Sequence, residues 1–193
     1  MTIEELENKA KEIRKDIVEM IYNAKSGHPG GSLSCIDIMT VLFHEKMNMD
    51  EDRFILSKGH CAPAYYACLA SIGKIPHEDL ITFRKIDSYL EGHPSNKING
   101  IDVSSGSLGQ GLSVANGMAL AGKLDNKDYY VYVVLGDGEL QEGQVWEAMM
   151  TASHYKLNNV IAFLDYNKLQ IDERRGECRR FLHLLKYRHY INL

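Results

Sequence analysis

Side chains that bind hard metal ions stand just after two apolar segments of this sequence. Asp137 follows the run at residues 129–135, and Asn167 follows the run at residues 160–165. A carboxylate, an amide oxygen and the backbone carbonyls after Asn167 are the oxygen donors that Mg²⁺ and Ca²⁺ prefer. With so few protein ligands, an octahedral ion would be completed by water and phosphate oxygens. These residues therefore predict a metal site that also binds a phosphate-bearing ligand.

Glycines on both sides of Asp137 favour the same ligand. Gly136 and Gly138 allow the backbone to approach a diphosphate closely. N–H groups at the start of the helix expected at residues 142–155 would stabilise its negative charge. The alternative is that the triplet Gly136-Asp137-Gly138 is an ordinary tight turn and Asn167 an ordinary loop residue. A dinucleotide site is not favoured, because the glycines lack the spacing G-x-G-x-x-G.

Both positions belong to a predicted βαβ unit. Apolar, β-branched and aromatic residues at 129–135 and 160–165 predict two strands, and the segment between them predicts a helix. Parallel strands joined by a right-handed crossover have their carboxyl ends at the same edge of the sheet. We therefore expect Asp137 and Asn167 to lie near one another.

The segments before this unit are predicted to be mainly helical. Between Ile3 and Asn23, apolar residues recur at three- and four-residue steps and predict an amphipathic helix that ends at the loop S-G-H-P-G-G. Further helices are expected at residues 36–43, 62–72 and 108–124 and after Pro76, with a short strand at residues 54–56. This alternation of helices and strands predicts an α/β protein.

The overall composition bounds the class of protein. The chain has 193 residues, 45% hydrophobic and 25% charged, which is typical of a soluble globular protein with one core. Its formal charge of −4 argues against nucleic acid and anionic membranes as partners. The four cysteines lack C-x-x-C spacing, and we find neither a secretory leader nor an apolar run of about 20 residues. We therefore expect a cytoplasmic protein without a disulfide framework.

Five sequence segments together resemble those of a known enzyme family. The triplet G-D-G around Asp137, followed 30 positions later by Asn167, resembles the signature of thiamine-diphosphate enzymes. Four more segments have the order and approximate spacing of the amino-terminal half of transketolases: S-G-H-P-G-G from Ser26, S-K-G-H from Ser57, G-H-P from Gly92 and S-G-S-L-G-Q-G ending at Gly111. The resemblance covers residues 1–172. It implies a three-layer thiamine-diphosphate-binding fold, with a mostly parallel sheet, helices on both faces and an incomplete carboxyl-terminal part.

The resemblance implies a role for each matching residue. Asp137, Asn167 and the carbonyl of Leu169 correspond to the family's ligands for the metal ion that binds the diphosphate. His28 and His93 resemble histidines that contact the sugar, and they are the expected catalytic residues. Ser107 departs from the family, which often has Pro there. The expected cofactor-binding residues are His60, Gly106, Ser107, Leu108, Gly136, Asp137, Gly138 and Asn167.

Each histidine also has a structural interpretation. A single His beside Gly is commonly a hydrogen-bonded loop residue. Three such loops together favour a catalytic role over a structural one. Imidazoles that change proton state near neutrality suit an enzyme that moves protons on and off sugar hydroxyls. Glu142 resembles a family glutamate at the boundary between subunits. Its alternative is an acidic residue in the first turn of a helix, stabilised by the helix dipole.

The activity implied by the resemblance is transfer of a two-carbon ketol group between sugar phosphates, with thiamine diphosphate and Mg²⁺ or Ca²⁺. The cofactor's thiazolium carbon attacks a ketose carbonyl and stabilises the carbanion left after cleavage. In the family, a pyrimidine-binding domain supplies the acid that activates the cofactor, and the site forms across a dimer. Such a domain does not fit in 193 residues. We therefore expect the partner to be a carboxyl-terminal transketolase subunit, in a dimer of such pairs.

The last 21 residues differ in composition from the rest. Residues 173–193 carry six Lys and Arg against two Glu, whereas residues 1–172 carry 16 basic and 24 acidic residues. We therefore expect a thiamine-diphosphate-binding domain at residues 1–172 followed by an atypical basic tail. A reading-frame shift or truncation, a genuine short variant and a basic segment for a partner all remain open. Accordingly, the alternative function is that of a non-catalytic cofactor-binding or interaction module.

Overall fold

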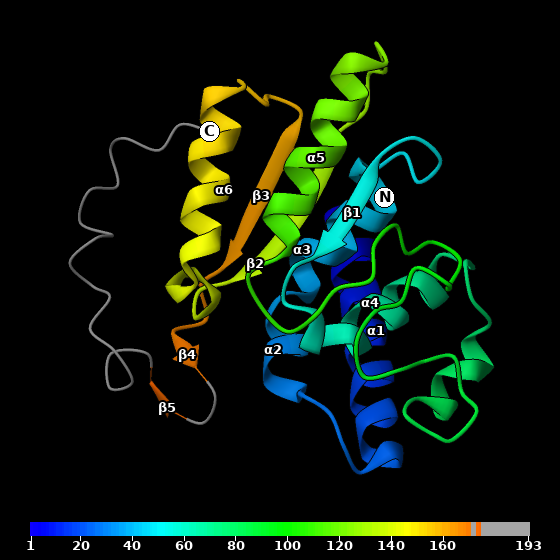
Figure 1. Ribbon diagram of the computed structural model, residues 1–193. Helices are drawn as coiled ribbons and strands as arrows, with labels where there is room; N and C mark the ends of the chain where they lie inside the picture. Colours follow the sequence, from blue (N-terminus) through cyan, green and yellow to red (C-terminus); the bar gives the residue numbers. More distant parts are fainter. Residues whose placement is uncertain (171–172, 175–193) are drawn as a thin grey trace.

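A three-stranded parallel sheet lies at the centre of the described part of the chain (Figure 1). The computed structural model of the protein describes residues 1–170 together with residues 173 and 174. The first elements are α1 (Ile3–Ala24), α2 (Pro29–Ser34), α3 (Ile36–Val41), the π-helical turn η1 (Leu42–Lys46), β1 (Arg53–Leu56), the 3₁₀ turn η2 (Gly59–Cys61), α4 (Ala62–Ser71) and the 3₁₀ helix η3 (His77–Thr82). There follow α5 (Gly111–Leu124), β2 (Val131–Gly136), the 3₁₀ turn η4 (Glu139–Gln141), α6 (Gly143–His154), β3 (Val160–Asp165), β4 (Leu169–Gln170) and β5 (Glu173–Arg174).

The sheet has the order β1-β2-β3, with both pairs of strands parallel. Val131 of β2 lies opposite Arg53 of β1 and Val160 of β3. Because α6 connects β2 to its parallel neighbour β3, the predicted βαβ unit is confirmed. The short strands β4 and β5 form a separate antiparallel pair.

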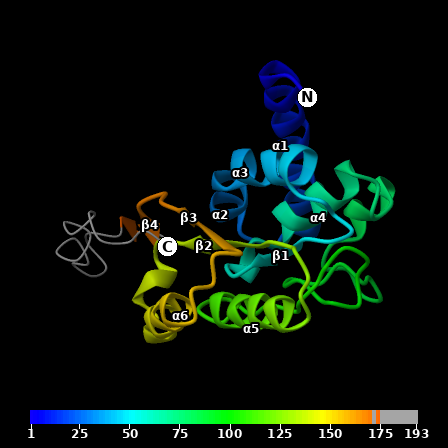
Figure 2. The same ribbon diagram turned by 90° about the horizontal axis from the view of Figure 1, so that it is seen from above.

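Successive residues of the strands face opposite layers of helices. Tyr132 and Val134 of β2 pack in one hydrophobic cluster with residues of α1, α3 and α4. Val133 and Leu135 pack in a second cluster with residues of α5 and α6. Figure 2 shows the sheet edge-on between these two layers. The expected three-layer α/β fold is therefore confirmed.

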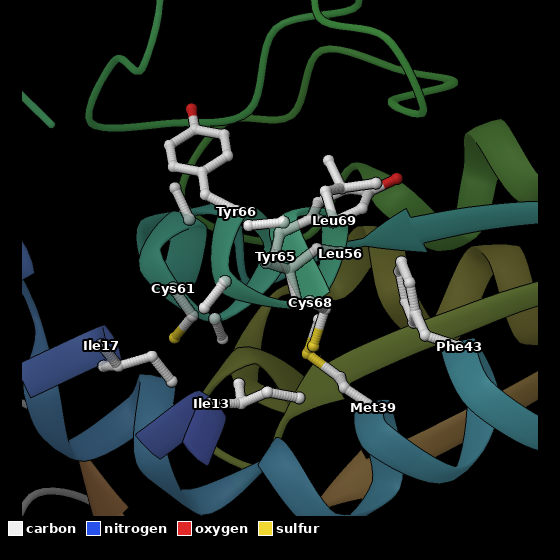
Figure 3. Close-up of a cluster of buried hydrophobic side chains, with 14 of the residues drawn as sticks. Ile13, Ile17, Met39, Phe43, Leu56, Cys61, Tyr65, Tyr66, Cys68 and Leu69 are labelled. Carbon is white, nitrogen blue, oxygen red and sulfur yellow. The ribbon is translucent and has the colours of Figure 1, made fainter. Parts of the chain in front are cut away.

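The helix α4 is the centre of the larger cluster, and Figure 3 shows side chains from α1, α3 and α4 gathered there. Its residues 62–70 are all buried, so the helix has no solvent-facing polar stripe. Tyr65 packs edge-to-face on Phe54, with 5.0 Å between the ring centroids. The hydroxyl of Tyr66 donates hydrogen bonds to the carbonyls of Glu91 (2.9 Å) and His93 (3.0 Å). The core thus holds the loop that carries His93, a predicted site residue.

Several details of the elements differ from the predictions. The segment S-G-H-P-G-G is not entirely a loop, because α2 begins at Pro29, where the fixed φ of proline suits the first residue of a helix. The helix expected after Pro76 is a 3₁₀ helix, and α5 begins at Gly111 rather than at 108.

The predicted basic tail lies outside the described residues, apart from the backbone of residues 173 and 174. The domain boundary at residue 172 therefore stays a prediction. None of the helices among the described residues combines the length and apolar character that a membrane-spanning segment requires.

Candidate functional site

Three loops leave the sheet where the parallel strands end, which is the edge at which open α/β sheets bind ligands (Figure 1). The loop after β2 carries Asp137, whose side chain is buried. The backbone N–H of Asp137 donates to the carbonyl of Asp165, at the end of β3, at 3.2 Å. Its carboxylate Oδ2 accepts a hydrogen bond from the backbone N–H of Lys168 at 3.0 Å. The predicted proximity of the Asp137 and Asn167 loops is confirmed.

Asn167 lies in the same neighbourhood and is half-buried. Its side-chain oxygen accepts the N–H of Leu169 at 2.9 Å, and its amide nitrogen lies 3.4 Å from the Ser34 hydroxyl. Within the described residues, no group of three or more His, Cys, Asp or Glu side chains could hold a metal ion. A single carboxylate, an amide oxygen and a backbone carbonyl instead form a donor set suited to Mg²⁺ whose remaining positions are filled by phosphate and water. The residues fit the predicted ion, and their role stays a prediction.

Two of the three predicted site histidines contact Ser107, and the third packs against one of them. The rings of His28 and His60 lie edge-to-face, with 5.3 Å between their centroids. Nδ1 of His60 is 3.2 Å from the Ser107 carbonyl oxygen, and Nε2 of His93 is 3.2 Å from the Ser107 hydroxyl. The loops that carry His60 and His93 therefore contact one exposed segment, and His28 lies beside His60.

The surroundings favour the neutral form of two of these imidazoles. Burial lowers the pKa of His60, and the nearby Lys58 ammonium and the other two histidines lower it further, whereas the hydrogen bond to Ser107 raises it. Burial also lowers the pKa of His93, as do the Arg84 guanidinium and His28. Near neutral pH, both rings can therefore accept a proton from a bound hydroxyl.

The segment Gly106–Leu108 is held by a close approach between two loops. Gly59 donates its N–H to the carbonyl of Gly106 at 3.1 Å. A Cβ atom added at Gly59 would lie 2.2 Å from that same oxygen, so only glycine fits there. Gly106, Ser107 and Leu108 are exposed, and Leu108 is 39% accessible. This surface is open to a ligand or to another polypeptide.

The backbone after Asp137 does not lead directly into a helix. The turn η4 follows Gly138, and α6 starts only at Gly143. The helix predicted at residues 142–155 is found as α6, and the turn η4 lies between it and the triplet Gly136-Asp137-Gly138. Glu142 is exposed and occupies the N-cap position of α6, one position before the first turn in which its structural alternative places it.

A buried ion pair that the sequence analysis did not identify connects several of these loops. Nζ of Lys58 lies 2.5 Å from Oδ2 of Asp165 and donates to the Gly31 carbonyl at 2.9 Å. Ser34 also hydrogen-bonds to that carboxylate oxygen. Burial lowers the pKa of the Lys58 ammonium, but its interaction with Asp165 opposes this effect, and the net direction is upward. The sequence signal that could have identified Lys58 is its place in S-K-G-H, two residues before a predicted site histidine.

Two further residues were also missed. Arg84 donates from Nη1 to the Ser26 hydroxyl at 2.5 Å, and its guanidinium packs beside Gly92, so it joins the loops that carry His28 and His93. Glu139 is a buried acid within the run that follows Asp137. No local pattern distinguishes either residue from an ordinary surface charge.

Comparisons with known proteins identify the family of this chain. Residues 6–181 match the family described as transketolase, thiamine diphosphate binding domain. One subunit of apulose-4-phosphate transketolase from Phocaeicola vulgatus is 45% identical over 179 residues, which cover 89% of this chain and 64% of that protein. Human transketolase is 47% identical over 198 residues, which cover 93% of this chain and 32% of the human protein. The chain thus spans less than two thirds of the length of these relatives.

Solved structures lead to the same family. Transketolase from Campylobacter jejuni superposes with a TM-score of 0.85 at 34% identity, over 93% of this chain and 31% of that one. Transketolase from Leishmania mexicana superposes with a TM-score of 0.86 at 33% identity, over 94% of this chain and 30% of that one. The resemblance read from the five motifs is confirmed: the chain belongs to the transketolase family, in which it corresponds to the amino-terminal, thiamine diphosphate binding domain.

Proposed function

We propose that this chain binds thiamine diphosphate together with Mg²⁺ or Ca²⁺ and serves as the amino-terminal subunit of a two-component transketolase. The observation that carries the proposal is the contact between the Asp137 carboxylate and the loop of Asn167, at 3.0 Å from the Lys168 N–H. It brings a carboxylate to the loop that carries an amide oxygen and the carbonyl of Leu169. These oxygens would hold the divalent ion that binds the diphosphate.

The rest of the cofactor site is built around this edge. Gly136 and Gly138 would leave space for the diphosphate, and His60 would contact it. The exposed segment Gly106–Leu108 would lie under the cofactor rings. When bound, thiamine diphosphate supplies a thiazolium carbon nucleophile and an electron sink for a two-carbon fragment.

The histidines would perform the proton transfers. His93 contacts the Ser107 hydroxyl and His28 packs against His60. Both would face the sugar hydroxyls around the reacting carbon. Because burial and the neighbouring cation lower the pKa of His93, this imidazole is neutral at physiological pH and able to accept a proton. The substrates would be sugar phosphates, from which a two-carbon ketol group is transferred.

The chain would need a partner that carries the pyrimidine-binding domain. Support comes from the Phocaeicola vulgatus relative, whose name describes it as one subunit of an enzyme and so implies at least one other polypeptide. The exposed Leu108 and Glu142 would lie at the boundary with the partner, in a dimer of such pairs. The relative's name also makes apulose 4-phosphate a first substrate to test.

A non-catalytic cofactor-binding module is the second candidate. Such a module would keep the cofactor half-site without completing ketol transfer. Reconstitution separates the two: the purified chain is mixed with a carboxyl-terminal transketolase subunit, thiamine diphosphate and Mg²⁺, and ketol transfer between a ketose phosphate and an aldose is followed. Turnover that requires both polypeptides supports the proposal. A folded chain that forms the complex and gives no turnover with any sugar phosphate would leave only the second candidate.

A further inference from the structure

Glu139 is a buried carboxylate whose side chain touches three of the site loops. It is 1% exposed and lies two residues after Asp137, in η4. Oε1 accepts hydrogen bonds from the Ser57 hydroxyl and from the N–H of Gly109, the latter at 2.7 Å. Oε2 accepts the N–H of Gly136 at 3.0 Å. A carboxylate removed from water is stable only when such donors replace its hydration.

The three donors come from distant parts of the sequence that meet at the cofactor edge. Gly109 follows the segment Gly106–Leu108, and its φ of +85° sets the direction in which the chain leaves that segment. Gly136 is the residue before Asp137. Ser57 opens the loop that carries His60, and its hydroxyl also accepts the N–H of Gly111, the first residue of α5, at 3.1 Å. One carboxylate therefore connects the segment expected under the cofactor rings to the backbone that orients the expected metal ligand.

We infer that Glu139 is a positioning residue that fixes the spacing between the segment Gly106–Leu108 and Asp137. This inference rests on the proposed function. The spacing matters because the two ends of thiamine diphosphate are joined covalently. The rings and the diphosphate both gain full contact only if the two parts of the site stand at the matching distance. Glu139 therefore sets the affinity for the whole cofactor more strongly than the affinity for a diphosphate alone.

The variant Glu139→Gln isolates this effect at nearly constant volume. The amide has one oxygen, whereas the carboxylate receives donors on both of its oxygens. An NH₂ group would therefore face the N–H of Gly109 or of Gly136, and one side of the connection would open. Ser57→Ala is a milder second variant, because it removes one donor and leaves both backbone contacts. Glu147→Gln is the matched control, since Glu147 is an exposed acid on α6.

The test compares two ligands by titration calorimetry in saturating Mg²⁺: thiamine diphosphate, and inorganic pyrophosphate as a probe of the metal end. For Glu139→Gln we expect a loss of about tenfold or more in affinity for thiamine diphosphate relative to pyrophosphate, the size expected for one charged hydrogen bond. Ser57→Ala should shift the ratio in the same direction by less, and Glu147→Gln should leave it at the wild-type value. If Glu139→Gln folds and its ratio of thiamine diphosphate affinity to pyrophosphate affinity is unchanged, this inference is overturned and the proposed function is not. If Glu139→Gln does not fold, an unchanged ratio in Ser57→Ala has the same meaning. A wild-type chain that binds no thiamine diphosphate, either alone or with its carboxyl-terminal partner, overturns the proposed function as well.

Discussion

Ser107 contacts two predicted site histidines through different atoms. Its carbonyl faces His60, and its hydroxyl faces His93. Ser107→Ala removes only the hydroxyl, so we expect the KM for the sugar substrate of the reconstituted enzyme to rise by up to about tenfold, the value of one hydrogen bond. The affinity for thiamine diphosphate, measured by calorimetry, should fall by less than the KM rises, because the Ser107 backbone that contacts His60 is unchanged. A fall in cofactor affinity as large as the rise in KM would contradict this division of roles.

The burial of His60 predicts how stability depends on pH. Burial lowers its pKa from the usual value of 6.5, so the folded chain binds fewer protons than the unfolded chain as the solution becomes acidic. The stability associated with the neutral ring is fully present above the unfolded pKa and is lost as the pH falls through the folded pKa.

Urea unfolding at about pH 7.5 and about pH 5, which lie on either side of the ordinary histidine pKa, measures this loss. The wild-type chain should lose more stability between these two values than His60→Gln, which cannot be protonated in this range. Equal losses in the two proteins would show that His60 is not among the groups that destabilise the fold in acid.

The helix α5 contains two glycines, Gly111 and Gly117, whose surroundings differ. A Cβ atom added at Gly111 would lie 2.5 Å from Cβ of Ser57, whereas one added at Gly117 would meet nothing within 4 Å. Gly117→Ala should therefore stabilise the protein by roughly 1 kcal/mol through helix propensity. Gly111→Ala should destabilise it, because Ser57 must move away from Glu139. Thermal unfolding of both variants checks this pair, and a gain in stability for Gly111→Ala would contradict the tight packing described for that end of α5.

Local sequence patterns predicted most of the elements, and long-range contacts account for what they missed. The apolar periodicity of residues 3–23 and the buried runs that became β2 and β3 depend on neighbours in sequence, so their types were predictable. Glu139 and Lys58 are ordinary charged residues in any local window. They are buried because Gly109 and Asp165, 30 and 107 residues away, supply their partners. Asp137 and Asn167 could be identified as candidate site residues because the βαβ unit itself determines their proximity.

In the three-stranded sheet, the side chains of the edge strand β3 are less buried than those of the central strand β2. The side chains of β2 from Val131 to Leu135 are buried, whereas those of β3 from Val160 to Phe163 are half-buried and Leu164 is 37% exposed. Within the described residues, β3 pairs only with β2. An edge of this kind promotes association between chains.

We therefore expect the isolated chain to associate with itself as its concentration rises. Leu164→Lys places a charge on the exposed edge and should reduce this association without changing the circular dichroism of the folded chain. Sedimentation velocity over a range of concentrations measures the effect. A monomeric wild-type chain at every concentration would show that the β3 edge is protected.

The central claim is that the oxygen donors at the ends of β2 and β3 hold a divalent ion, which in turn binds the diphosphate of the cofactor. Titration calorimetry with thiamine diphosphate, in Mg²⁺ and in excess chelator, tests it on the wild-type chain and on Asp137→Ala. We predict saturable binding to the wild-type chain that requires Mg²⁺ and is abolished by Asp137→Ala. Equal affinity in both proteins, or binding that persists in chelator, would contradict the account.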